Sequence, residues 1–392
     1  MPPSSNATPI SPLAAAIRGA LALAIAMGIG RFAFTPLLPM MQADAGVSLA
    51  AGGWLASANY LGYFAGALLA PLLAWQRGAV IRFALAAVVA STLAMGFADQ
   101  LAAWVLLRAL AGVLSAWLLI FTSEWCLGQL SGKAQLAGVL YAGVGAGIAL
   151  AGGVCLGLML AGADSETAWL ALGALAFAGT ALVWPAFRNT SGAARALSLR
   201  PRGHGAEGWR LIRGNAANGF GYIIPATFLP AMARELLGDP AVFGLAWPLF
   251  GAAAVVSTLA AGALLRVAGN RRLWAASHCL MAAGAALPVF VPGLAAILFS
   301  ALAVGGTFMV ATMCAIREAR AVAGDRATGL IAAVTAAFAL GQLLGPVLVA
   351  SLSLAGLADP YPPALLLAAL LLVASGCELA QRPASQPPGE SA

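Results

Sequence analysis

The chain has 392 residues, of which 62% are hydrophobic and only 8% are charged. Soluble domains carry about 25% charged residues, so the composition excludes a water-facing surface and predicts an integral membrane protein in a lipid bilayer. The net charge of +7 does not indicate binding of nucleic acid, because the sequence has no basic patch interleaved with aromatic residues.

Long apolar runs recur along the whole chain, and a bilayer core needs about 20 apolar residues per helix. We expect a short disordered tail at residues 1–12 and a C-terminal tail at residues 381–392. Between these tails the sequence predicts an all-α fold of twelve transmembrane helices at residues 13–41, 52–74, 80–98, 101–125, 134–160, 167–187, 211–233, 241–265, 273–290, 294–316, 327–353 and 363–380.

The hydrophilic segment 188–210 divides these helices into two bundles of six, at 13–187 and 211–380, and is predicted to be a cytoplasmic linker. Internal similarity supports the division. "GIGRFAFTPLLPMM" at 28–41 aligns with "GFGYIIPATFLPAM" at 219–232, and "AGALL" occurs at both 65–69 and 261–265. Parallel repeats of six helices around a central site are typical of secondary transporters.

Basic residues fall on one side of the predicted bilayer. All but three of the 20 Lys and Arg residues lie on the side of the N-terminus. The exceptions are Arg234, on the opposite side, and Arg31 and Arg108, which lie inside helices. By the positive-inside rule this pattern predicts that both termini are cytoplasmic, in a multi-pass protein of the inner (cytoplasmic) membrane.

Arg31 and Arg108 are the most unusual residues of the predicted spans. A charge near the bilayer centre costs about 2.5–3.5 kcal/mol on insertion scales, and arginine cannot lose its charge. One hypothesis is that both guanidinium groups bind an organic anion, since carboxylates and phosphates fit the guanidinium fork. The alternative is that each group binds backbone carbonyls or Gln and Asn side chains and shapes the helices.

Polar residues elsewhere in the spans are candidates for the lining of the same cavity. Asn59 lies in the second span, Gln342 lies in the eleventh, and Tyr222 aligns with Arg31 across the repeat. Hydrogen bonds between helices are the alternative role for these side chains, and such bonds contribute about 0.6 kcal/mol each.

Acidic residues end two helices at equivalent positions of the repeat. Glu124 ends the fourth helix, where Arg77 could pair with it, and Glu318 ends the tenth, where Arg271 or Arg272 could do so. The sequence predicts that these pairs form a latch on the inner side, with a plain solvated charge as the alternative.

Several motifs resemble the major facilitator superfamily. Within it, "GIGRFAFTPLLPMMQ" (28–42), "WLASANYLGYFAGALL" (54–69) and "TAAFALGQLLGP" (335–346) resemble the YbfB/YjiJ-type family, and "RALAGVLSA" (108–116) resembles an Arg-x-x-x-Gly motif of the fourth helix. This resemblance implies two pseudo-symmetric six-helix bundles, alternating access, and a central cavity lined by the first and fourth helices. Both guanidinium groups would then face one aqueous site.

We therefore predict a secondary transporter of a small organic solute, anionic in character. Alternatives are an efflux carrier of drugs or hydrophobic compounds, and a non-transporting sensor or scaffold on the same fold. The five cysteines are scattered singly and no nucleophile–base motif is present, so we expect no metal, no cofactor and no enzymatic activity. A co-transported ion or proton stays open, although no Asp or Glu lies in the middle of a span.

Overall fold

The computed structural model describes residues 10–381 apart from residues 131, 189–203, 238–239, 292, 325–326 and 358, and it leaves the side chains of residues 49 and 227–244 undescribed. Most residues of the predicted tails at 1–12 and 381–392, and most of the predicted linker at 188–210, lie outside the described residues. The division of the chain into these regions therefore stays a prediction.

The described residues are helical, with short connections and no strand among them. In chain order they form α1 (Pro12–Leu23), the π-helical segment η1 (Ala24–Phe32), α2 (Phe34–Asp44), α3 (Leu49–Leu69), the short η2 (Ala70–Leu72), α4 (Arg77–Phe97), α5 (Leu101–Gln129), α6 (Leu136–Leu160), α7 (Ser165–Val183), the short η3 (Trp184–Phe187), α8 (Gly205–Leu237), α9 (Pro240–Leu264), α10 (Asn270–Phe290), α11 (Leu294–Ala323), α12 (Ala327–Leu354) and α13 (Tyr361–Ala380).

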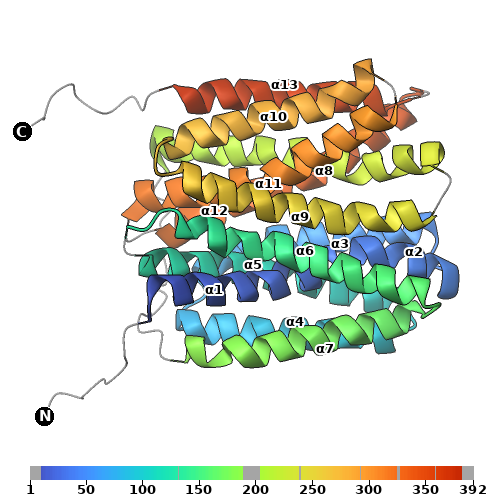
Figure 1. The fold of residues 1–392 in the computed structure, drawn as a ribbon, viewed down its shortest axis with the longest axis horizontal. Helices are drawn as coiled ribbons and strands as arrows, with labels where there is room; N and C mark the ends of the chain where they lie inside the picture. The colour runs from blue at the N-terminus through green and yellow to red at the C-terminus, as the bar shows by residue number, and fades with distance from the viewer. Residues whose placement is uncertain are drawn as a thin grey trace, which may run out of the picture.

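Ten stretches of the described chain are long and apolar enough to cross a membrane, the first of them running from Pro12 to Asp44 through α1, η1 and α2. The helices α3 and α8 lie among them in the bundle (Figure 1). Two predicted boundaries are wrong: α11 ends at Ala323 rather than at residue 316, and α8 begins at Gly205 rather than at residue 211. Its first turn contains Glu207, and a negative charge at this position stabilises a helix N-terminus.

Helices α1–α7 occupy one side of the molecule, and α8, α10, α11 and α13 occupy the other (Figure 1). The first helix begins and the last helix ends at the same end of the bundle, on the left in this view. We call this end the basic end. It is where α4 begins at Arg77, α5 ends at Gln129, α8 begins at Gly205 and α11 ends at Ala323. The charge distribution predicts that the basic end is cytoplasmic.

The two sets of helices meet where α6 packs against α9 and where α3 packs against α12. Glycine allows the first of these contacts to be close. A Cβ atom on Gly145 of α6 would lie 2.7 Å from the carbonyl oxygen of Gly251 on α9, too near for any larger residue. Small residues of this kind provide van der Waals packing between helices in a membrane, where burial from water contributes little.

The outward faces of the helices carry large apolar side chains, and Trp54, Leu106, Leu182 and Leu370 are among those that are exposed. An apolar exterior of this extent is suited to hydrocarbon rather than to water. Polar side chains are instead concentrated inside the bundle, where Arg31, Arg108 and the polar candidates of the sequence are buried.

Candidate functional site

The first span changes from α-helix to π-helix at Ala24, and Arg31 lies in the last turn of the π-helical segment. The π-helical segment η1 has the sequence "AIAMGIGRF", and a wider turn of this kind is frequent at functional sites. A Cβ atom on Gly28 would lie 2.3 Å from the backbone of Gly147, so η1 lies directly against α6. The regular helix resumes at Phe34, which places Arg31 next to a break in the backbone.

Arg108 of α5 binds the backbone at this break. Its Nη1 and Nη2 atoms donate to the carbonyl oxygens of Gly30 at 3.3 Å and Arg31 at 3.1 Å. Its guanidinium carbon lies 4.5 Å from the centroid of the Phe34 ring. Both terminal nitrogens thus have backbone partners, which matches the second hypothesis for this residue. Arg108 fixes the position of η1 and of Arg31 with it.

Asn59 of α3 supports the same arrangement from the other side of α5. Its side-chain amide donates to the carbonyl oxygen of Arg108 at 3.0 Å, and the residue is fully buried. Gly112 makes this contact possible, because a Cβ atom there would lie 2.2 Å from the carbonyl oxygen of Asn59. Asn59 therefore contacts Arg31 only indirectly, through Arg108.

Arg31 itself is buried and reaches across to the other set of helices. Its Nη2 atom donates to Oε1 of Gln342 on α12, and its guanidinium carbon lies 3.7 Å from the centroid of the Tyr63 ring. The Nε and Nη1 atoms of Arg31 and the Nε2 atom of Gln342 have no hydrogen-bond partner among the described residues. The pair is thus a bridge between α1–α7 and α8–α13 with unused donors on both sides.

Tyr222 lies in a group of aromatic rings beside this bridge. The Tyr222 ring stacks on Phe308 with centroids 4.9 Å apart, and Phe308 lies 6.2 Å from Phe32, the residue after Arg31. We call the connected and buried rings the central aromatic cluster: Phe32, Tyr222, Trp247, Phe250, Phe308 and Phe338. We refer to α1–α7 as the first half and to α8–α13 as the second half. Four spans of the second half and one span of the first half contribute to the central aromatic cluster.

No acidic side chain among the described residues neutralises the charge of the site. The ion pairs of the described chain involve Arg77, Arg210, Arg213 and Arg271, but neither Arg31 nor Arg108. A buried cation is stable only if carbonyls, rings or an anion compensate for lost hydration. Two backbone carbonyls compensate for the lost hydration of Arg108. Arg31 has only one amide oxygen and the faces of aromatic rings as partners among the described residues.

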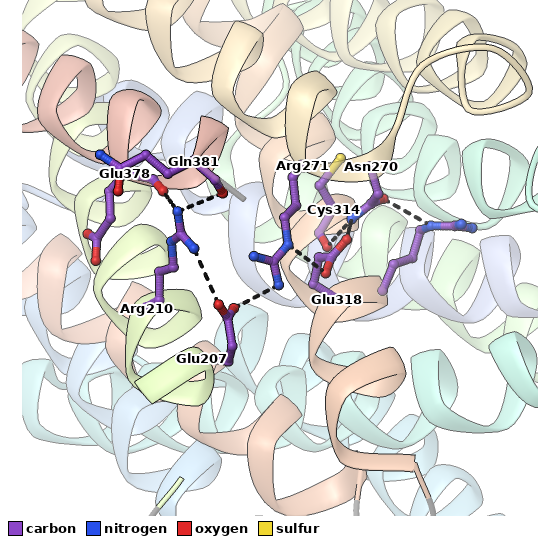
Figure 2. A network of polar contacts seen from close by, with 9 residues as sticks. Glu207, Arg210, Asn270, Arg271, Cys314, Glu318, Glu378 and Gln381 are labelled. Carbon is purple, nitrogen blue, oxygen red and sulfur yellow. Dashed lines mark hydrogen bonds and ion pairs between the residues drawn. The ribbon is translucent and has the colours of Figure 1, made fainter. Parts of the chain in front are cut away.

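The predicted latch residues lie at the basic end. Arg77 contacts Glu124 at 2.7 Å, and Arg271 contacts Glu318 at 3.1 Å. Arg272 is exposed and forms no ion pair with a described residue. Figure 2 shows that Arg271 also contacts Glu207, which in turn contacts Arg210. The residues near Glu318 therefore form a network within the second half.

Glu124 differs from Glu318 because it also joins the two halves. Its carboxylate accepts a hydrogen bond from the Thr328 hydroxyl at 2.7 Å, and its carbonyl oxygen accepts one from Arg320 at 3.0 Å. A further bond across the halves runs from Arg317 to the carbonyl oxygen of Ala134 at 3.1 Å. These contacts close the basic end in this structure.

Glu207 has a perturbed pKa. Partial burial alone would raise the pKa of the carboxyl group, but hydrogen bonds and positive charge from Arg271 and Arg210 outweigh it. The net effect lowers the pKa of Glu207 below its ordinary value of 4.5. The carboxylate is therefore held ionised, and it keeps the start of α8 attached to α10.

Comparisons with known proteins decide the family. Residues 23–379 match the model of the family described as "Uncharacterised MFS-type transporter YbfB". The chain belongs to this family.

The fold of this MFS transporter is also found among solved structures. It resembles the crystal structure of the human organic anion transporter MFSD10 (TETRAN) with a TM-score of 0.71 and 14% sequence identity, over 93% of this chain and 99% of that one. At this identity the likeness concerns the fold alone, and it agrees with the predicted all-α membrane fold. No curated protein sequence matches the chain significantly.

Two features of this transporter's site were not predicted from the sequence. Contacts between residues far apart in the chain, such as the bond from Arg31 to Gln342, do not follow from any local pattern. The central aromatic cluster was missed for the same reason, although Phe338 lies in "TAAFALGQLLGP" beside Gln342 and its spacing of four residues from Gln342 places both on one helix face.

Proposed function

We propose that this protein carries a small organic anion across the cytoplasmic membrane by alternating access, with Arg31 as the residue that binds the anionic group. The observation that carries the proposal is the state of Arg31: buried, permanently charged, without a carboxylate partner among the described residues, and with two unused nitrogens.

The bridge to Gln342 suggests how binding is linked to movement. An anion between the two side chains would accept hydrogen bonds from the guanidinium of one half and from the unused amide nitrogen of the other. The present bond from Arg31 to the neutral amide oxygen of Gln342 has one charged partner, whereas a bond from Arg31 to an anion has two and adds direct attraction between opposite charges. The anion would therefore replace a weaker contact between the halves by a stronger one when the site closes around it.

We assign supporting roles to the other candidates. Arg108 and Asn59 position Arg31 through the backbone, and Tyr222 belongs to the wall of the site. Glu124, with Arg77 and Thr328, is the latch at the basic end, and Arg271 with Glu318 is the equivalent pair within the second half. The latch contacts between halves must break before a solute can pass at this end.

The middle parts of the described spans hold no Asp or Glu that could carry a proton. Proton-coupled carriers usually use an intramembrane acid or histidine relay. His278 accepts a hydrogen bond from Trp274 at 2.9 Å, within the second half and away from Arg31. Uniport or exchange of one anion for another fits this arrangement better than a proton relay.

Binding of anions to the purified protein tests the proposal. Arg31→Gln keeps hydrogen-bonding capacity but removes the charge, so we expect anion affinity to fall about 10- to 100-fold. Arg272→Gln, the same change at an exposed position, is the matched control and should leave affinity unchanged. A thermal-shift screen against organic anions, amphiphiles and cationic drugs gives the readout. Preference for cations, or equal binding by wild type and Arg31→Gln, would refute the proposal.

A further inference from the structure

We propose that the site is selective for carboxylates with a flat aromatic body over saturated carboxylates of the same size; this inference rests on the proposed transport of anions. It follows from the kind of apolar surface that surrounds Arg31 rather than from the charge itself.

Aromatic faces surround the guanidinium group. The guanidinium carbon of Arg31 lies 3.7 Å from the ring centroid of Tyr63, 5.4 Å from that of Phe32 and 5.9 Å from that of Tyr60. A carboxylate bound to Arg31 would therefore place its next atoms against rings on the same side of the molecule.

The rings continue from Arg31 into the second half. The ring centroid of Phe32 lies 6.4 Å from that of Trp247 and 6.2 Å from that of Phe308. The ring centroid of Phe308 lies in turn 5.2 Å from that of Phe250 and 4.9 Å from that of Tyr222. The contacts of Phe32 with Trp247 and Phe308 join the two halves and must separate when the halves move apart. Separation would expose ring faces and edges next to the unused donors of Arg31 and Gln342.

A flat ring suits this surface better than a saturated one. Aromatic rings prefer stacked or edge-to-face contacts with centroids about 4.5–7 Å apart, which stabilise a pair beyond the effect of buried area. The observed rings already have this geometry with one another, so a bound aromatic ring could replace Phe32 as the partner of Phe308. One such contact corresponds to a preference of about three- to tenfold.

Benzoate and cyclohexanecarboxylate form a matched pair of probes, because both join a carboxylate to a six-membered ring. We expect wild-type protein to bind benzoate about three- to tenfold more tightly, by isothermal titration in detergent. Phe308→Leu keeps an apolar side chain but removes the ring, and it should bring the ratio of the two affinities close to one. Phe187→Leu breaks the Phe187–Trp125 ring pair in another part of the bundle and should leave the ratio unchanged.

The outcomes separate this inference from the proposed function. Loss of the benzoate preference in Phe308→Leu alone, with a melting temperature like that of Phe187→Leu, supports it. Equal affinities for both probes in wild type, both lost in Arg31→Gln, would overturn the aromatic preference and leave anion binding intact. If the wild type binds neither probe nor any other organic anion, both proposals fail. A ratio that changes equally in both Phe variants would also overturn the inference, since the effect would then be on packing in general.

Discussion

Gln342→Glu is the substitution that probes the bridge most sharply. It changes an amide to a carboxylate with almost no change in size, at the atom that accepts the hydrogen bond of Arg31. The new carboxylate would form an ion pair with Arg31 and occupy the place that we assign to the substrate. The ion pair should offset most of the destabilisation that a buried carboxylate without a cationic partner would cause. The variant should also no longer bind anions.

The size of both effects follows from the burial of the pair. Gln342 is fully buried and Arg31 is 2% exposed, so solvent screens their interaction weakly. Two unit charges about 4 Å apart attract by about 4 kcal/mol at an effective dielectric constant of about 20, which offsets much of the cost of burying the carboxylate. A substrate must compete with this partner and lose a charge-assisted bond, so its affinity should fall at least about 10- to 100-fold.

The assay is the melting temperature and benzoate affinity of four proteins: wild type, Gln342→Glu, Arg31→Gln and the double variant. With Arg31 present, Gln342→Glu should change stability little or raise it. Without Arg31 the same change buries an unpaired carboxylate, which destabilises by about 3–5 kcal/mol. If Gln342→Glu has the same effect in both backgrounds, or binds benzoate like wild type, the two residues are not coupled and the account of the bridge is wrong.

Two further predictions concern the basic end. Glu124→Gln replaces the carboxylate that accepts a hydrogen bond from Thr328 of the other half by a neutral amide, which should weaken closure by about 1 kcal/mol. The buried thiol of Cys314 lies on α11, which packs against α6 of the other half. Its labelling by a water-soluble maleimide should therefore become about fivefold faster, and an unchanged rate would argue against the latch. Glu207 has a lowered pKa in the folded protein, so its contribution to stability is complete above pH 4.5 and is lost as the pH falls through the lowered pKa. Wild type should accordingly melt at a higher temperature than Glu207→Gln at pH 7, and the difference should shrink below pH 4.5; a constant difference would contradict the assigned ion pairs.

Much of the fold could be predicted because the bilayer imposes a simple pattern. Apolar runs separated by Gly, Pro and charged residues predicted most of the observed helix ends within a few residues, and α12 at Ala327–Leu354 is an example. The start of α8 and the end of α11 were misplaced because "GAEGWR" (205–210) and "REARAVA" (317–323) contain charged residues. Hydropathy does not reveal a helix that continues beyond the apolar segment.

The site was predictable in its parts but not in its connections. Arg31 is conspicuous in the sequence because a charge in an apolar run requires an explanation. The difference between Arg31 and Arg108 was not visible, since it depends on the π-helical segment that presents the carbonyls of Gly30 and Arg31 to Arg108. That segment depends on packing against Gly147, which lies more than a hundred residues away along the chain.

Counterflow of labelled benzoate in proteoliposomes tests the central claim most directly. Vesicles loaded with unlabelled benzoate should accumulate the label when they contain wild-type protein or Arg272→Gln, and should not do so when they contain Arg31→Gln at the same level of reconstituted, folded protein. Accumulation by Arg31→Gln at the wild-type rate would contradict the claim that this buried guanidinium binds the transported anion.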